Sequence, residues 1–433
     1  MSNIKKLLTK GVELIKGGLL HILTGNILNR AFSMISGVVV ANFVDKIEYA
    51  NISYADNIYS YIALLSGIGM SNAILRYCAI QKEKSMERAY MKYAFKCGGL
   101  FELGVSVLAC IVMAVVDIPY PRARIYMWIL VLYPMLSYFN TCLGCYMRTQ
   151  LENKKYAING VINSSVLCVA SIVLVITIGT VGVMPARYIA IGVTLIYAFS
   201  YYGKHLKGID AGKLSPEQKK AFWSMGVSLM IAQLFNGIMP INESFLVNNI
   251  IQDEITTSNF RVAGQFPQLL SLISSALTVY YFPLIAKMTD FRQIKNTGIK
   301  VGVLNAVIVG SVTGVAMLLT PFALNLLYGG KYNDAISISY VLWIMRATNG
   351  CFRAVPVSIL AAIGKIKFNA GLAVCACIVQ TILDYIFIKQ YGVIGVAYGT
   401  IIVYAISAVL YWAYFINVCN KNINNGNPQS EIA

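Results

Sequence analysis

The chain has 433 residues, of which 58% are hydrophobic and 12% are charged, and its mean hydropathy is +0.65. The 35 Lys and Arg residues outnumber the 18 Asp and Glu residues, so the formal net charge is +17 at pH 7. This composition excludes a soluble globular protein and predicts an all-α polytopic membrane protein. No nucleic-acid-binding pattern accompanies the positive charge. We therefore predict no nucleic-acid partner and attribute the charge to membrane topology and to contact with anionic membrane lipids.

The predicted elements begin with residues 1–17, a basic amphipathic segment expected to lie on the cytoplasmic membrane surface. A transmembrane helix needs about 20 mostly apolar residues, and this length defines about twelve spans. They are residues 18–44, 54–80, 93–116, 125–147, 156–179, 183–202, 221–250, 259–286, 298–320, 336–360, 368–389 and 392–417. Six spans form an N-terminal half, 18–203, and six form a C-terminal half, 221–417. A basic cytoplasmic linker, 204–220, joins the halves, and a cytoplasmic tail, 418–433, ends the chain.

Glycine and proline residues divide the two longest apolar stretches. Gly179, Gly182 and Pro185 are expected to separate the fifth span from the sixth. Pro321, with the glycine pair that follows it at 329–330, is expected to end the helix of the ninth span.

Basic residues cluster in every second gap between the predicted spans. Lys82, Lys84 and Arg88 follow the second span, and Lys154 and Lys155 follow the fourth, whereas the intervening gaps hold few basic residues. Because Lys and Arg are enriched in cytoplasmic loops, this alternation predicts that both termini are cytoplasmic.

A short glycine motif occurs twice. Gly179 and Gly182 are spaced like Gly392 and Gly395, and in each case the preceding helix begins after a short turn containing two lysines. This pattern predicts two parallel six-helix halves related by a pseudo-two-fold axis along the membrane normal. Such halves enclose a central cavity and transport by alternating access.

Three stretches of the sequence resemble a known family. They are Asn29-Arg30 together with 66–76 (SGIGMSNAILR), 364–369 (GKIKFN) and 391–400 (YGVIGVAYGT). These stretches are similar to the polysaccharide flippases (Wzx type, O-antigen or capsule) of the multidrug/oligosaccharidyl-lipid/polysaccharide (MOP) exporter superfamily. The resemblance implies a multi-pass protein of the bacterial cytoplasmic (inner) membrane that is not an enzyme. It would carry a polyprenyl-diphosphate-linked oligosaccharide from the cytoplasmic to the outer leaflet, with a polysaccharide polymerase or glycosyltransferases as candidate contacts.

Arginines inside the predicted spans are candidates for contact with the diphosphate. Arg346 and Arg353 are seven residues apart, which places them on one face of an α-helix, about 10.5 Å apart along its axis. A guanidinium group suits phosphate because its planar fork donates hydrogen bonds in pairs. Arg30 and Arg261 are expected to complete a basic cavity, and with Arg76 they are placed like an arginine cluster of the related lipid II flippases.

The alternative for these arginines is a structural role. Arg30 could pair with Glu243 and Arg346 with Asp384, while Arg261 could extend toward the lipid headgroups.

Four polar residues form a candidate cation site. Gln380 and Asp384 are one helical turn apart on the eleventh span, and the lipid II flippases have an amide and an aspartate so spaced. In those proteins a threonine follows sixteen residues later, as Thr400 does here. Their seventh span carries an acid, and Glu243 or Asn242 is at that place here. Together these oxygens could bind Na⁺ or exchange H⁺ as the coupling ion, and we predict no other cofactor. The alternative is a polar contact that locks helices together.

Two competing functions start from the same composition. A multidrug cation antiporter of the same superfamily would need an acidic, aromatic cavity. The predicted spans instead hold four candidate arginines and three carboxylates, so positive charge is in excess. A membrane glycosyltransferase or polymerase would need a long external loop with catalytic groups, and the external gaps are short. Tyrosines such as Tyr404 could stack on sugars, although an interfacial position is the simpler interpretation of each.

Overall fold

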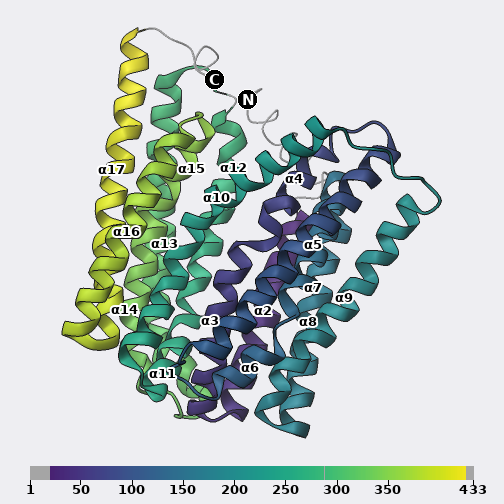
Figure 1. Ribbon diagram of the computed structural model, residues 1–433. Coiled ribbons are helices and arrows are strands. Elements are labelled where there is room, and N and C mark those ends of the chain that lie inside the picture. Colours follow the sequence, from purple (N-terminus) through teal and green to yellow (C-terminus); the bar gives the residue numbers. More distant parts are fainter. Residues whose placement is uncertain (1–19, 287, 426–433) are drawn as a thin grey trace. The chain divides into compact units, whose positions relative to one another are not determined.

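A computed structural model describes residues 20–286 and 288–425 (Figure 1). The described residues form helices joined by short turns and contain no strand, as the composition predicts. The amphipathic segment predicted at 1–17 lies outside them, as does the end of the predicted tail, whereas α17 continues to Asn425.

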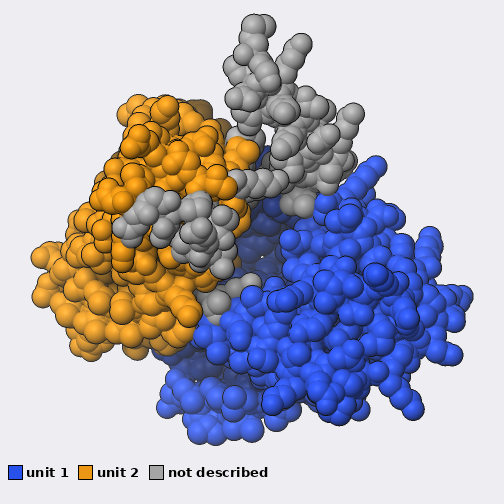
Figure 2. Space-filling model, turned by 90° about the horizontal axis from the view of Figure 1, so that it is seen from above, with its two compact units in different colours: residues 1–234 blue, residues 235–433 orange. Residues whose placement is uncertain are grey.

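The helices divide into two compact units, residues 1–234 and 235–433, which Figure 2 shows in different colours. The helices of the first unit are α2 (Leu20–Phe43), α3 (Lys46–Leu64), η2 (Ser66–Gly69), α4 (Met70–Tyr77), α5 (Lys84–Val115), α6 (Ala123–Ile129), α7 (Tyr133–Thr149), α8 (Asn153–Ile178), η3 (Thr180–Gly182) and α9 (Val183–Leu206). The boundary between the units falls within α10 (Pro216–Leu246).

The second unit continues through a further set of helices. They are η4 (Val247–Ile251), α11 (Glu254–Gln265), η5 (Pro267–Leu269), α12 (Leu270–Ala286), α13 (Phe291–Tyr328), α14 (Ala335–Thr348), η6 (Asn349–Arg353), α15 (Ala354–Ala362), α16 (Ile366–Tyr391), η7 (Gly392–Ile394) and α17 (Gly395–Asn425).

Large apolar side chains are exposed along these helices, as expected for surfaces that face lipid. Val107, Leu108 and Val115 are 54%, 58% and 78% exposed on α5, and Leu318 is 82% exposed on α13. Six helices among the described residues are long and apolar enough to cross a membrane, and a seventh span results if α6 and α7 count as one. The chain is therefore a multi-pass membrane protein, and the count of twelve spans stays a prediction.

Several predicted spans are broken helices. The span predicted at 125–147 bends by 49° between α6 and α7, where Pro134 lies in the first turn of α7 and disfavours α-helical geometry in the residue before it. The prediction that Pro321 helps to end the helix of the ninth span is wrong, because α13 runs through Pro321 to Tyr328. Gly329, with φ 57°, caps α13 in the left-handed conformation.

The second predicted span is broken by a left-handed turn in η2. Gly67, Ile68 and Gly69 have φ of 54°, 49° and 76°. The N–H of Gly67 donates to Oε1 of the buried Glu102 at 2.5 Å. A Cβ atom on Gly67 would lie 1.8 Å from the ring of Tyr138, so only glycine fits between that ring and the turn.

The glycine repeat has the same backbone geometry in both units. Gly179 (φ 72°, ψ −158°) ends α8, and Gly392 (φ 64°, ψ −148°) ends α16. A short 3₁₀ turn follows Gly179 as η3, and one begins at Gly392 as η7. A Cβ on Gly182 would lie 2.4 Å from a carbonyl oxygen of α8, and one on Gly395 would lie 2.1 Å from a carbonyl oxygen of α16. Each motif therefore lets two antiparallel helices meet closely, and the predicted repeat corresponds to a shared local structure.

Candidate functional site

A buried ion pair lies within the second unit. Arg346, in the last turn of α14, donates from Nη2 to Oε2 of Glu243 on α10 at 2.7 Å. The side chain of Glu243 is 2% exposed and that of Arg346 is 19% exposed. Arg346 therefore pairs with Glu243, a partner that the sequence analysis did not give it, whereas the pairing expected there was with Asp384.

Arg353 lies between two tyrosine rings of α17. Its guanidinium carbon is 5.4 Å from the ring centre of Tyr404 and 5.6 Å from that of Tyr411, a geometry of cation–π attraction. Its Nη1 donates to Oδ1 of Asn349 at 3.3 Å, and its buried Nε has no hydrogen-bond partner among the described residues. Arg353 also forms no ion pair with any described residue, so its positive charge is not neutralised locally.

Arg346 and Arg353 both contact Tyr404. The segment that carries them is not the regular α-helix that the sequence predicted. Residues 349–353 form a π-helix, which changes the angle between Arg346 and Arg353. The side chain of Tyr404 interacts with Arg346 and its ring faces Arg353. Tyr404 is only 3% exposed, so the interfacial position favoured for it from the sequence is wrong.

The polar residues of the candidate cation site lie together. Nε2 of Gln380 donates to Oγ1 of Thr400 at 2.9 Å, and this hydroxyl lies 3.2 Å from Oδ2 of Asp384. All three side chains are fully buried. Glu243 is close enough to Asp384 for their carboxyl groups to interact electrostatically. The structure thus brings together all four residues that the sequence selected.

Two oxygen atoms in this cluster have no donor. Oε1 of Glu243 and Oε1 of Gln380 are buried and without a hydrogen-bond partner in the described part of the chain. Burying an unsatisfied oxygen is costly, and a hard cation coordinated by oxygen atoms would satisfy both. Across residues 20–286 and 288–425, no three His, Cys, Asp or Glu side chains converge to hold a metal ion. A cation here would therefore also need the amide and hydroxyl oxygens.

A glycine on α17 allows Asp384 to take this position. A Cβ on Gly399 would lie 2.3 Å from Oδ1 and 2.9 Å from the backbone N of Asp384. The Gly395–Gly399 spacing, which is typical of close helix packing, therefore also leaves space for a buried carboxylate.

The remaining predicted arginines lie elsewhere. Arg30 is exposed on α2, next to Asn29, which accepts a hydrogen bond from Ser164 of α8 at 2.9 Å. Arg76 is exposed in the last turn of α4, and Arg261 is half-buried on α11. Their predicted contact with substrate stays a prediction.

The first unit contains ion pairs that the sequence analysis did not select as a site. Arg187 of α9 pairs with Asp56 of α3 at 2.5 Å, and the side chains are 17% and 24% exposed. Glu48 pairs with Arg122 and accepts a hydrogen bond from the hydroxyl of Tyr126 at 2.5 Å. The polar character of each residue was visible in the sequence, but their partners lie 74 or more positions away.

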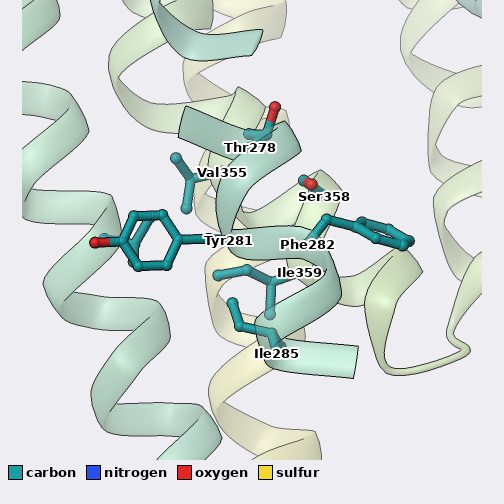
Figure 3. A pocket seen from close by; sticks show the side chains of 8 residues that line it. Thr278, Tyr281, Phe282, Ile285, Val355, Ser358 and Ile359 are labelled. Carbon is teal, nitrogen blue, oxygen red and sulfur yellow. The ribbon is translucent and has the colours of Figure 1, made fainter. Parts of the chain in front are cut away.

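A small pocket lies between α12, α13 and α15 (Figure 3). Tyr281 and Phe282 of α12 and Val355 and Ser358 of α15 line it, and it is mostly apolar. Its room for about one water molecule is far too small for a sugar.

The fold of the described residues is similar to that of solved transporters of the MOP superfamily. The structure is similar to the inward-facing conformation of a multidrug resistance MATE family transporter of that superfamily, with a TM-score of 0.75 at 15% identity over 91% of this chain and 95% of that one. It is also similar to a MOP-superfamily transporter from Pyrococcus furiosus, whose binding pocket is described as having reversed polarity. There the TM-score is 0.64 at 15% identity over 95% and 96% of the two chains.

Sequence comparison identifies the family to which the chain belongs. A sequence model of the polysaccharide biosynthesis protein family matches residues 15–289, more than half of the chain, so the chain belongs to that family. The chain is 22% identical to a Shigella flexneri protein named as a candidate O-antigen transporter. The match extends over 256 residues, which are 58% of this chain. The match spans 61% of the length of that relative.

Proposed function

We propose that this protein is a flippase that moves a polyprenyl-diphosphate-linked oligosaccharide across the bacterial cytoplasmic membrane for O-antigen or capsule synthesis. Family membership, the MOP-type fold and the name of the Shigella flexneri relative support a transporter of this kind. Transport would proceed by alternating access of two six-helix halves, 18–203 and 221–417, without chemical change of the substrate.

The observation that carries this proposal is the pair of arginines at Tyr404. Placing a charged side chain inside a membrane is costly, by about 2.5–3.5 kcal/mol even on insertion scales, so each charge needs a compensating role. Glu243 neutralises Arg346, whereas Arg353 keeps its charge and a buried Nε without a hydrogen-bond partner among the described residues. A diphosphate supplies the negative charge and the acceptor oxygens that Arg353 lacks.

Glu243, Gln380, Asp384 and Thr400 are the proposed coupling site, where Na⁺ or H⁺ would drive transport. The buried oxygens without donors support a cation in this cluster. Arg30 and Arg261 are proposed as further contacts of the diphosphate sugar. We also propose that both termini are cytoplasmic, and that polysaccharide polymerase or glycosyltransferases are partners.

A second candidate is a multidrug cation antiporter of the same superfamily. The fold similarity to a multidrug resistance transporter favours it, as do the two buried carboxyl groups of Glu243 and Asp384. Against it stands Arg353, whose charge would repel a cationic drug.

Transport in proteoliposomes distinguishes the two functions. We expect the purified protein to move a fluorescent sugar linked to undecaprenyl diphosphate between leaflets, and not to accumulate ethidium in response to an imposed Na⁺ or H⁺ gradient. Ethidium accumulation without movement of the lipid-linked sugar would favour the antiporter and overturn the flippase.

A further inference from the structure

The carboxylate of Glu243 belongs to two sites at once. Its Oε2 accepts from Arg346 at 2.7 Å, while its Oε1 is buried in the cluster with Asp384 and has no hydrogen-bond partner among the described residues. Oε1 of Gln380, on the same cluster, is likewise without one. The same group therefore holds an arginine of the anion site and offers an oxygen to a cation.

The charges around Glu243 determine what a cation would do. With both carboxyl groups ionised, the charges of Glu243, Asp384, Arg346 and Arg353 sum to zero, although only Arg346 is in direct contact with a carboxylate. A bound Na⁺ would add one positive charge and share the carboxylate that holds Arg346. Because interactions between charges are strong where water is scarce, the ion pair would weaken and the cluster would favour an anion.

We infer that Na⁺ bound by Glu243, Gln380, Asp384 and Thr400 releases Arg346 from Glu243 to bind the diphosphate of the substrate. This inference rests on the proposed flippase function. It makes Na⁺ and the diphosphate cooperative ligands, each raising the affinity for the other. A drug antiporter would show the opposite linkage, because there a coupling cation and a cationic drug compete.

The two arginines then have different roles. Arg353 lies against Tyr404 and Tyr411 with no ion pair to any described residue, so it is available to an anion whether Na⁺ is present or not. Arg346 is engaged by Glu243 until a cation takes its place. Na⁺ would therefore convert a site with one available guanidinium into a site with two.

Equilibrium binding to the purified full-length protein tests this inference, with farnesyl diphosphate as the probe. Calorimetric titrations are run at pH 8 in 150 mM NaCl and in 150 mM N-methyl-D-glucamine chloride. We expect the dissociation constant to be about tenfold lower in Na⁺, within the usual range of coupling between two ligands. Titrations in N-methyl-D-glucamine at pH 6.5 form a further arm, in which we expect no tightening.

Three variants locate the effect. Glu243→Gln should bind the probe tightly with and without Na⁺, because Arg346 is no longer held by a carboxylate. Arg346→Gln should bind weakly in both salts through Arg353. Glu217→Gln, the same change at an exposed position of the same helix, should behave like the wild type.

The wild-type protein provides a second readout that does not depend on a variant folding. Binding of ²²Na⁺ should tighten with farnesyl diphosphate by the same factor as the probe tightens with Na⁺, because linkage is reciprocal. Probe affinity that is equal in both salts, or that rises at pH 6.5 without Na⁺, would overturn the inference and leave the flippase intact. Absence of probe binding in every condition would overturn both.

Discussion

At the scale of single residues, Glu243 and Arg346 stabilise each other inside an apolar protein. Removing one partner of such a pair leaves the other charge buried and uncompensated, which costs about 3–5 kcal/mol, whereas removing both costs much less. The pair therefore has a measurable signature that is independent of transport.

We expect Arg346→Met to lower the thermal midpoint of unfolding of the detergent-purified protein clearly, since Glu243 then loses its cation. The double variant Glu243→Gln with Arg346→Met should recover most of that loss. Fluorescence-detected thermal stability measures both changes. Additive losses in the double variant would show that the two side chains do not depend on each other.

Some of this site was predictable from single residues and some was not. Gln380 and Asp384 share a helix face by their spacing, and their contact with Thr400 followed from the family resemblance. The Glu243–Arg346 pair depends on how α10 packs against α14, and sequence spacing carries no information about that contact. The role of Tyr404 was missed for the same reason, because one of many tyrosines cannot be singled out before its neighbours are known.

At the scale of elements, the glycine motifs were the most reliable sequence signal. Gly179 and Gly392 end their helices where predicted, since a left-handed or related backbone is open to glycine at no steric cost. The predicted helix end at Pro321 was wrong, because a long membrane helix tolerates proline. The helix breaks at η2 and between α6 and α7 occur at Gly67, Gly69 and Pro134. These residue types favour such breaks, but a prediction of spans from hydropathy alone does not take them into account.

The repeated turns predict matched effects in the two units. Gly182→Ala and Gly395→Ala should each destabilise the protein, by about 1–3 kcal/mol, because the added Cβ meets a carbonyl of the preceding helix. Gly192→Ala, on α9 with no atom within 4 Å of its Cβ position, is the matched control. Thermal unfolding in detergent measures all three. Equal stability of the three variants would remove the structural basis of the repeat.

At the scale of the whole molecule, composition was sufficient to predict a helical membrane protein. The number of spans and their orientation rest on the distribution of Lys and Arg along the chain, and this distribution is a statistical signal of insertion. It describes how the chain crosses the membrane, and does not say which helices pack together.

Topology can be tested with cysteines introduced into a background that lacks the native ones. Cysteines near Lys84, Lys213 and Lys295 should react in intact cells only with membrane-permeant thiol reagents. Those near Asp253 and Asp334 should react with impermeant reagents as well. Equal labelling of both groups by impermeant reagents would contradict cytoplasmic termini and the twelve-span arrangement.

The most direct test of the central claim is the rate at which the reconstituted protein flips a fluorescent sugar linked to undecaprenyl diphosphate. Wild type should flip this lipid and should not flip the same sugar on uncharged polyprenol. Arg353→Ala should abolish flipping at unchanged reconstitution, and Arg353→Lys should restore part of it, because an ammonium group keeps the charge without the paired donors. Equal flipping of the charged and uncharged lipids, or full activity of Arg353→Ala, would contradict diphosphate recognition by this arginine.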